Sequence, residues 1–177
     1  SPADMPAVKN SKGTEVKCTA AGPASVFVFK TTLEEHIGEI NYFRVMSGKI
    51  TENFDAVNTS NGTRERLSQI FACAGRNRTR IPEIHAGDIG GFVKLKNTKT
   101  NHTLNAPGND WTYEEMMFPA PKYRVAIKPL SESDEEKMGE ALNKMHQEDP
   151  TILVEYSKEL KQIITHGQGE YHLNILK

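Results

Sequence analysis

The sequence predicts a β-barrel followed by a truncated α+β domain of the ferredoxin-like type. Residues 25–118 contain short β-branched and aromatic runs, about 8 to 12 residues apart and without a helical period. Residues 119–177 instead follow the order β-α-β-β-α, which lacks only the last strand of a split βαβ unit. The segment Phe118-Pro-Ala-Pro121 marks the boundary, because proline fixes its own φ and restricts the preceding residue. Residues 1–24 are polar, contain Pro and Gly, and are expected to form a linker and loop.

Strands are predicted within the barrel region from composition and turn signals. Two of them flank Ser60-Asn61-Gly62, and Asn-Gly between two strand-like runs is the strongest local indication of a hairpin. The predicted strands span residues 25–30, 39–46, 54–59, 63–71 and 89–95. Pattern alone leaves an open sandwich as the alternative to a closed barrel.

The second region is expected to contain three strands and two helices. A capping box, Ser133-x-x-Glu136, predicts the start of the first helix, and Asp149-Pro150 predicts its end. The apolar face of that helix consists of Met138, Ala141, Leu142 and Met145. The strands are predicted at residues 123–128, 151–156 and 162–165, with a turn at 157–160 and a second helix after Gly167-Gln-Gly169. Since the sixth element is missing, strand 123–128 is expected at a sheet edge, and the chain is expected to be part of a longer protein.

Composition excludes several classes of protein. The 177 residues include 22 Lys and Arg against 23 Asp and Glu, as in an ordinary globular protein. The longest apolar run, residues 26–29, is far shorter than a membrane span, and no secretory signal opens the chain. Cys18 and Cys73 are too few for a disulfide framework or a metal motif. These features indicate a cytoplasmic protein that does not contact a membrane.

The sequence lacks the motifs of the common catalytic sites. It contains no Gly-x-x-x-x-Gly-Lys-Ser/Thr loop, no His-Glu-x-x-His pair and no Gly-x-Ser-x-Gly elbow. His166 and His172 lack a third metal ligand at a suitable spacing. No catalytic residue and no metal site are therefore predicted.

Arginine placement gives the main binding prediction. Five of the seven arginines lie between residues 64 and 80: Arg64, Arg66, Arg76, Arg78 and Arg80. Arg64 and Arg66 share one strand parity, so both are expected on one face, where guanidinium groups suit nucleic-acid phosphates. The alternative is a charged barrel exterior in which Glu65 and Glu83 are the partners of these arginines. Positive charge continues along the chain at Lys94, Lys96 and Lys99.

A second candidate site is Gly167-Gln-Gly169-Glu170. Two glycines between a strand and a helix permit a close backbone approach and leave N–H groups at the positive end of the helix. A simple tight turn is favoured over an anion site, because Gly-x-Gly alone is a weak signal.

Several of these segments resemble the elongation factor G family of translational GTPases. Residues 134–142, Glu148-Asp-Pro-Thr151 and Gly167-Gln-Gly-Glu-Tyr-His-Leu173 are similar to the third domain of that family. Four earlier segments are similar to its second domain, a translation-factor β-barrel: Phe43-Arg-Val-Met-Ser-Gly48, Arg64-Glu-Arg66, Ala86-Gly-Asp-Ile89 and Lys96-x-Thr-Lys-Thr100. The order is collinear over nearly the whole chain, and residues 1–6 are similar to the exit from the GTPase domain.

The resemblance implies a role without an activity for this chain. In the family, a separate GTPase domain binds and hydrolyses GTP with Mg²⁺, and neither cofactor is expected here. The barrel contacts small-subunit rRNA and protein, which makes Arg64, Arg66, Arg78 and Arg80 the candidate rRNA contacts. The third domain couples the nucleotide state to translocation, and the residues matching Gly167, Gly169, Glu170 and His172 lie at the junction with the GTPase domain. From physics alone, the alternative is that His172 is just a partly buried helix residue.

Departures from the family pattern indicate a divergent paralogue. Met46 and Tyr171 stand where Tyr and Leu are usual, residues 72–78 replace a stretch that typically contains His-Ala-Asn-His, and Gly90-Gly-Phe92 stands where small alanines are common. Elongation, ribosome recycling and ribosomal protection all remain open for the parent protein. A stand-alone RNA- or ligand-binding barrel is the competing class, and an enzyme acting alone is a distant third.

Overall fold

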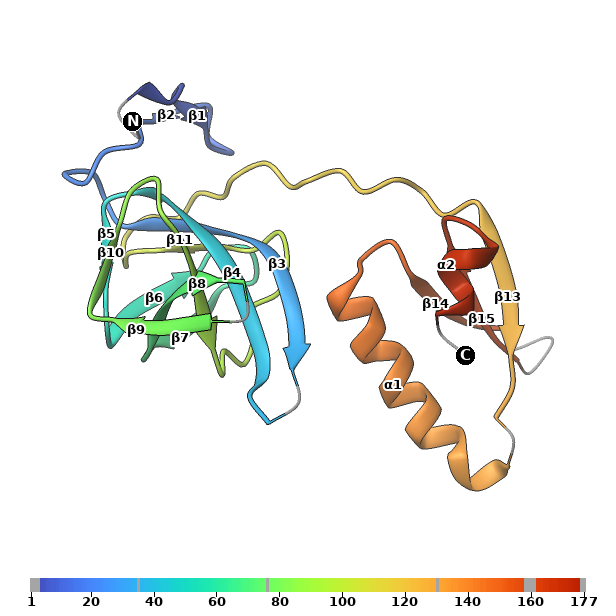
Figure 1. Ribbon diagram of the computed structural model, residues 1–177. Helices are drawn as coiled ribbons and strands as arrows, with labels where there is room; N and C mark the ends of the chain where they lie inside the picture. The colour runs from blue at the N-terminus through green and yellow to red at the C-terminus, as the bar shows by residue number, and fades with distance from the viewer. Residues whose placement is uncertain (1–3, 35, 76, 130, 158–161, 176–177) are drawn as a thin grey trace. The chain divides into compact units, whose positions relative to one another are not determined.

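The computed structural model divides the chain into two compact units, Ser1–Met116 and Met117–Lys177. It describes residues 4–34, 36–75, 77–129, 131–157 and 162–175. Figure 1 shows that the first unit is built of strands, whereas the second combines strands with helices. The division lies two residues before the boundary expected from the proline-rich segment. Each unit is described below by itself.

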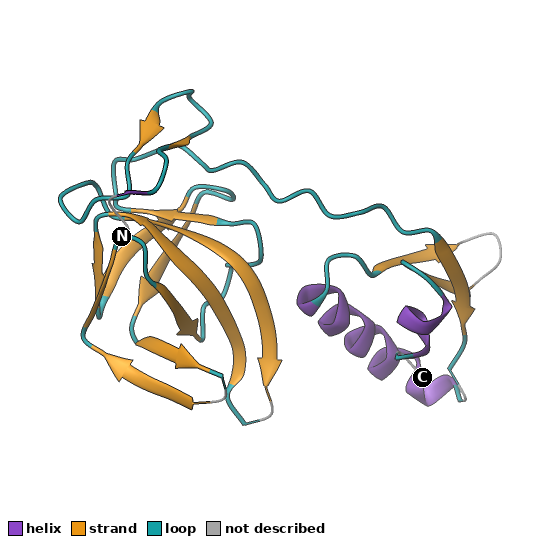
Figure 2. Ribbon diagram, turned by 45° about the horizontal axis from the view of Figure 1, so that its top comes forward, coloured by secondary structure: helices purple, strands orange, loops and turns teal. Residues whose placement is uncertain are grey.

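The first unit is a β-barrel whose main sheet has eight antiparallel strands. Their order is β7-β6-β12-β3-β4-β11-β8-β9. The strands are β3 (Ser25–Glu34), β4 (Gly38–Ser47), β6 (Phe54–Asn58), β7 (Thr63–Leu67), β8 (Ile70–Ala74), β9 (Asn77–Ile81), β11 (Ile89–Val93) and β12 (Thr103–Asn105). A separate pair joins β5 (Lys49–Thr51) to β10 (Glu83–His85). The sheet curls around one core (Figures 1 and 2), so the predicted barrel is confirmed.

The barrel core explains why glycine stands at position 90. Phe43 and Phe92 are fully buried and stack with their ring centroids 3.7 Å apart. A Cβ atom at Gly90 would lie 2.8 Å from the ring of Phe43 and 2.8 Å from the side chain of Ile84. Real Cβ atoms do not approach neighbours this closely, so the large aromatic pair requires a residue without a side chain here. This departure from the family pattern therefore has a packing cause.

The strong turn signal in the barrel predicts the observed hairpin, whereas several short strands have no clear signal in the sequence. The β6–β7 hairpin forms around the predicted Asn-Gly turn, with Gly62 at φ +77°. The strand predicted at residues 63–71 is two strands, because the ladder breaks between Leu67 and Ile70. β5, β9, β10 and β12 were not predicted. Each is only three to five residues long. β5, β10 and β12 pair with strands that are distant in sequence, whereas β9 forms a hairpin with β8.

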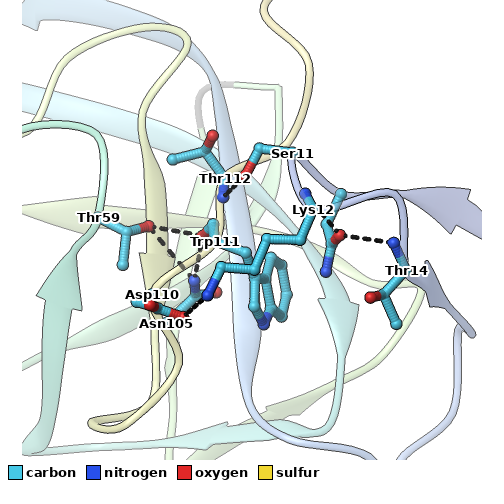
Figure 3. A network of polar contacts seen from close by, with 9 residues as sticks. Ser11, Lys12, Thr14, Thr59, Asn105, Asp110, Trp111 and Thr112 are labelled. Carbon is cyan, nitrogen blue, oxygen red and sulfur yellow. Dashed lines mark hydrogen bonds and ion pairs between the residues drawn. The ribbon is translucent and has the colours of Figure 1, made fainter.

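The first 24 residues are not only linker and loop, as the sequence suggested. β1 (Val8–Lys9) pairs with β2 (Glu15–Val16) in a short ribbon, and Asn10 forms an isolated bridge to Tyr113. The ribbon turn is tied to residues 110–112, where the Thr112 N–H donates to Ser11 Oγ over 3.0 Å and Lys12 pairs with Asp110 (Figure 3). These contacts join segments about 100 residues apart, so no local pattern could indicate them.

Trp111 anchors that contact region to the barrel. Its carbonyl accepts hydrogen bonds from Asn105 Nδ2 over 2.6 Å and from Thr59 Oγ1 over 2.9 Å (Figure 3). Asn105 is fully buried, and its Oδ1 accepts a bond of 2.6 Å from Ser25 Oγ. Buried polar groups are stabilising only when they are satisfied in this way. The network therefore fixes residues 110–113 against β3, β6 and β12.

The second unit is a three-stranded antiparallel sheet with two helices. The strand order is β13-β15-β14, which matches the first three strands of the predicted ferredoxin-like unit. Its elements are β13 (Tyr123–Ile127), a 3-10 turn (Glu132–Asp134), α1 (Glu135–Glu148), β14 (Leu153–Ser157), β15 (Gln162–Gly167) and α2 (Glu170–Asn174). Both helices lie on one side of the sheet (Figure 2). Neither described helix is long and apolar enough to cross a membrane.

The predicted capping box is wrong, although the predicted end of the helix is right. Asp134, not Ser133, is the N-cap residue of α1, and its side chain makes no capping hydrogen bond. Ser133 instead lies in the preceding 3-10 turn, where Ser131 Oγ donates to Asp134 Oδ2 over 2.7 Å. Asp149 ends α1 in an extended conformation before Pro150. The turn predicted at residues 157–160 lies mostly outside the described residues.

Candidate functional site

Two of the four candidate RNA-contact arginines project from β7, an edge strand of the barrel sheet. Arg64 and Arg66 are exposed, whereas the alternating residues Glu65 and Leu67 are buried, so the predicted shared face is confirmed. Arg66 pairs with Asp55 over 3.4 Å, and both side chains remain mostly exposed. Arg64 has no ion-pair partner among the described residues. Both arginines line an open groove of about 590 Å³.

The other two arginines lie on β9, at the opposite end of the strand order, and each is held by a carboxylate. Arg78 pairs with Glu34, and only 14% of its side chain is exposed. The Tyr42 hydroxyl and Glu34 raise the pKa of the Arg78 guanidinium. Arg80 is exposed, and two of its nitrogens bond to the Glu52 carboxylate, which raises the pKa of Arg80 and lowers that of Glu52. Arg76 lies outside the described residues.

Three of the four arginines therefore have carboxylate partners, but not the ones considered from the sequence. Glu65 is buried and accepts hydrogen bonds from the Asn97 N–H over 2.7 Å and from Thr98 Oγ1 over 3.2 Å. Glu83 pairs with Lys49 over 3.4 Å and with His85 over 3.2 Å. Closeness in sequence does not predict these ion pairs, because alternate residues of a strand point to opposite faces. The observed partners of the arginines come from neighbouring loops and strands.

In the second unit, Gly167 permits a close approach between β15 and α2. A Cβ atom on Gly167 would lie 2.6 Å from Leu173 Cδ2 and 3.2 Å from His172 Nδ1. Leu173 is buried, so its side chain would have to shift to make room for that Cβ atom. Gly169 has extended backbone, and nothing lies within 4 Å of where its Cβ atom would be. The first glycine is therefore required for packing, as the tight-turn interpretation expects, and the second is not.

His172 links the two segments that most resemble the family's third domain. Its Nδ1 accepts a hydrogen bond of 3.1 Å from the Gln168 N–H, so the proton of the neutral ring lies on Nε2. Nε2 donates to Asp149 Oδ2 over 3.0 Å. The other oxygen of Asp149 accepts bonds from the Thr151 N–H over 2.9 Å and from Thr151 Oγ1 over 2.6 Å. The contact thus joins the end of α1 to the start of α2.

Asp149 is a site residue that sequence reasoning missed. The sequence predicts Asp149 only as the end of a helix, yet it is the partner that orients His172. Partial burial disfavours its ionised form, but the bonds from Thr151 and His172 outweigh that effect and lower the pKa of Asp149. Gln168 adds another tie, because its Nε2 donates to the Pro119 carbonyl over 3.0 Å. Asp149 could have been predicted only by pairing the segment 148–151 with the segment 167–173. No pattern within either segment indicates that the two are in contact.

The remaining candidate, Glu170, lies on an apolar groove beside the open edge of β13. The groove has a volume of about 480 Å³, and Val125, Met138 and Leu173 contribute to its lining. Tyr171, next to Glu170, is 90% exposed. No group of three His, Cys, Asp or Glu side chains suited to a metal ion occurs within the described ranges.

Comparison with known proteins adds three matches. The family model described as "Elongation factor G domain 2" matches residues 23–106, and "Elongation Factor G, domain III" matches residues 118–177. A crystal structure of a protein from Thermus thermophilus superposes with a TM-score of 0.74 at 26% sequence identity. That match covers 88% of this chain and 24% of the other, so this chain spans about a quarter of the length of that protein.

Proposed function

This chain belongs to the elongation factor G family, and we propose that it binds the ribosome as the non-catalytic middle portion of a translational GTPase. Its first unit is the family's second domain, and its second unit is the family's third domain. The collinear match of both domains is the observation that carries the proposal. We place the protein in the cytoplasm, where translation factors act.

The barrel is the part proposed to contact small-subunit rRNA and protein. Arg64 is exposed without an ion-pair partner in the described part of the chain, and Arg66 and Arg80 have only surface pairs, which are worth about 0–1 kcal/mol. Arg64 is free to bind a phosphate, and Arg66 and Arg80 can exchange their carboxylates for phosphates at little cost. Arg78 is different, because it is mostly enclosed by Glu34 and Tyr42. We assign Arg78 a role in holding β9 to β3.

The second unit is proposed to couple the nucleotide state of the parent GTPase domain to translocation. The Asp149–His172 hydrogen bond supports this role, because it makes the ends of α1 and α2 move together. A contact of the GTPase domain with Gly169, Glu170 or Tyr171 would therefore be transmitted to α1. GTP and Mg²⁺ belong to that other domain, since this chain has no phosphate-binding loop with a lysine and a Mg²⁺-binding hydroxyl.

Ribosome binding is tested with the protein and purified small ribosomal subunits. Co-sedimentation at several salt concentrations should show binding that weakens steeply with salt, because phosphate contacts release counterions. R64A/R66A/R80A should weaken the binding and flatten its salt dependence, whereas the charge-matched R44A/R124A/K144A should not. Absence of sedimentation with either ribosomal subunit would contradict the proposal.

The absence of nucleotide chemistry in this chain is a separate prediction. Isothermal titration of the 177-residue chain with GTP and Mg²⁺ should show no specific binding, and phosphate release should stay at the buffer level. Micromolar binding of GTP by this chain would contradict the assignment of the nucleotide to another domain.

A further inference from the structure

The loop after β11 presents three lysines to solvent. Lys94, Lys96 and Lys99 are exposed, and none has an ion-pair or hydrogen-bond partner for its ammonium group among the described residues. Leu95 is buried at 6% exposure and Thr98 at 1%. These two buried residues alternate with the lysines and hold all three on the solvent side of the loop.

Buried polar side chains from two other strands fix the shape of this loop. Asn58, at the end of β6, is fully buried, and its Nδ2 lies 3.2 Å from the Asn97 carbonyl and 3.2 Å from Thr98 Oγ1. Glu65 on β7 accepts the Asn97 N–H over 2.7 Å. A buried carboxylate without such donors would be strongly destabilising, so the loop and Glu65 require each other.

The end of the loop is fixed in the same way. His102 Nδ1 accepts the Lys99 N–H over 3.1 Å and lies 3.0 Å from Asn58 Nδ2, so this nitrogen carries no proton. Burial, and then the charge of Lys99, lower the pKa of His102 and keep the ring neutral. Asn101 has φ +72°, and its side chain bonds to both the N–H and the carbonyl of Met116 over 3.0 and 3.1 Å. The loop is thus rigid before any ligand binds.

We propose that this preformed loop binds the phosphate backbone of RNA through Lys94, Lys96 and Lys99. The inference rests on the proposed function and names a site within it. A rigid loop loses little conformational entropy on binding, and free ammonium groups need not give up a carboxylate first. Both features distinguish the lysines from Arg66 and Arg80, which are already paired. Ammonium groups act as point charges on phosphates, so the loop contributes affinity without reading base sequence.

The carboxylates around the loop leave this charge available. Glu65 is occupied by the Asn97 N–H and Thr98, and Glu39 accepts a bond of 2.9 Å from Asn41 Nδ2. Glu115 is exposed and acts electrostatically on His102. The chain as a whole has a net charge of −1, so the positive loop is a local feature and not the result of a basic protein.

The test compares two triple variants that change the net charge equally. K94Q/K96Q/K99Q removes the free lysines, and K12Q/K17Q/K49Q removes three exposed lysines elsewhere in the same unit, two of which have carboxylate partners. Binding of both variants and of the wild-type chain is measured with small ribosomal subunits and with an RNA duplex, at several salt concentrations. The loop variant should bind both probes at least tenfold more weakly at about 100 mM salt, and its salt slope should fall by about 2–3.

Each outcome has a defined meaning. If the loop variant keeps the wild-type affinity and slope, the lysine site is wrong, while the proposed ribosome binding stands. If both triple variants lose equal affinity, net charge and not this loop is responsible, and the inference is overturned. If only binding to subunits weakens and binding to the duplex does not, the partner is a ribosomal protein, and the RNA assignment is wrong. If the wild-type chain binds neither probe, the proposed function fails with it.

Discussion

The two units differ in how completely they bury their apolar residues. The barrel has a core of thirteen buried residues drawn from almost all of its strands, whereas the second unit buries only Leu142, Ile152 and Leu173 among its described hydrophobic side chains. Large hydrophobic residues that stay exposed are concentrated in the second unit: Met117, Phe118, Tyr123, Leu153, Tyr156, Tyr171 and Ile175. A smaller domain buries a smaller fraction of its surface than a larger one.

This difference in burial also separates the two candidate sites, because one lies outside the packed core of its unit and the other is part of the packing. In the barrel, the exposed candidates Arg64, Arg66 and Arg80 and the three loop lysines lie outside the core, so they can be changed without loss of the fold. In the second unit, Gly167, His172 and Asp149 are themselves part of the packing. We therefore expect substitutions to separate binding from stability in the first unit, and to change both together in the second.

Two spectroscopic probes follow the units separately. The single tryptophan, Trp111, is in the barrel and is 9% exposed, so its fluorescence follows unfolding of the first unit. Both α-helices of the described chain are in the second unit, so circular dichroism at the helix band follows that unit. The comparison between units can then be tested in one molecule.

The largest effect is expected for Gly48→Ala in the barrel. Gly48 has φ +72°, and a Cβ atom there would lie 2.7 Å from the backbone of Ala24 and from the Gly22 carbonyl. Left-handed strain adds to overpacking against rigid backbone, so the free energy of unfolding should fall by about 3 kcal/mol. Tryptophan fluorescence in a denaturant titration measures the change.

Gly62→Ala is the matched control for that substitution. Gly62 has a similar φ of +77°, but nothing lies within 4 Å of its Cβ position. Only the backbone strain of about 1 kcal/mol is expected. Equal losses in the two variants would show that steric contact at Gly48 is unimportant, and a shift of the helix signal would show that the units do not unfold separately.

Gly167→Ala should have the next largest effect, in the second unit. The added Cβ atom would overlap Leu173 and disturb the His172 ring, at an expected cost of about 1–3 kcal/mol. The helix signal should melt earlier, while the tryptophan transition stays unchanged. Gly169→Ala, with free space at its Cβ position, should change little. The packing role is wrong if the two alanine variants melt at the same temperature.

Asp149→Asn should destabilise the second unit by about 1 kcal/mol at neutral pH. Since the folded state lowers the pKa of Asp149, its ionised form stabilises the fold above about pH 4, and this contribution is lost as the pH falls further. The difference between wild type and variant should therefore disappear at low pH. Thermal melts from about pH 7 to about pH 2 measure it, with Asp55→Asn on the exposed Arg66 pair as the control. A difference that stays constant with pH would exclude the charged hydrogen bond as the cause.

The smallest effect is expected at the edge of the second sheet. β13 pairs only with β15, so alternate amides on its other side lack a strand partner among the described residues. β4 lies between β3 and β11. Hydrogen exchange should be at least tenfold faster for the outward amides of residues 123–127 than for those of β4. Equal protection in a dilute monomer would mean that the second unit is as stable as the barrel and that its edge is covered.

Local chemistry determined much of this fold from the sequence alone. The Asn-Gly turn fixed the β6–β7 hairpin, Asp149-Pro150 ended α1, and the change of period separated a barrel from an α+β domain. These features depend on residues within a few positions of each other, where steric limits on φ and side-chain periodicity act directly. The identity of the two domains followed from the same local segments.

Tertiary structure alone decided which groups meet. Arg78 pairs with Glu34 and Arg80 with Glu52, while Glu65, the nearest acid in sequence, turns inward to hold Asn97. His172 forms a hydrogen bond to Asp149 at the end of another helix, and the ribbon at residues 8–16 contacts the segment around Trp111. The sequence shows which side chains can form such bonds. Which bonds form depends on strand order, register and burial, because these bring together residues that are about 20 to 100 positions apart, beyond the reach of any local pattern.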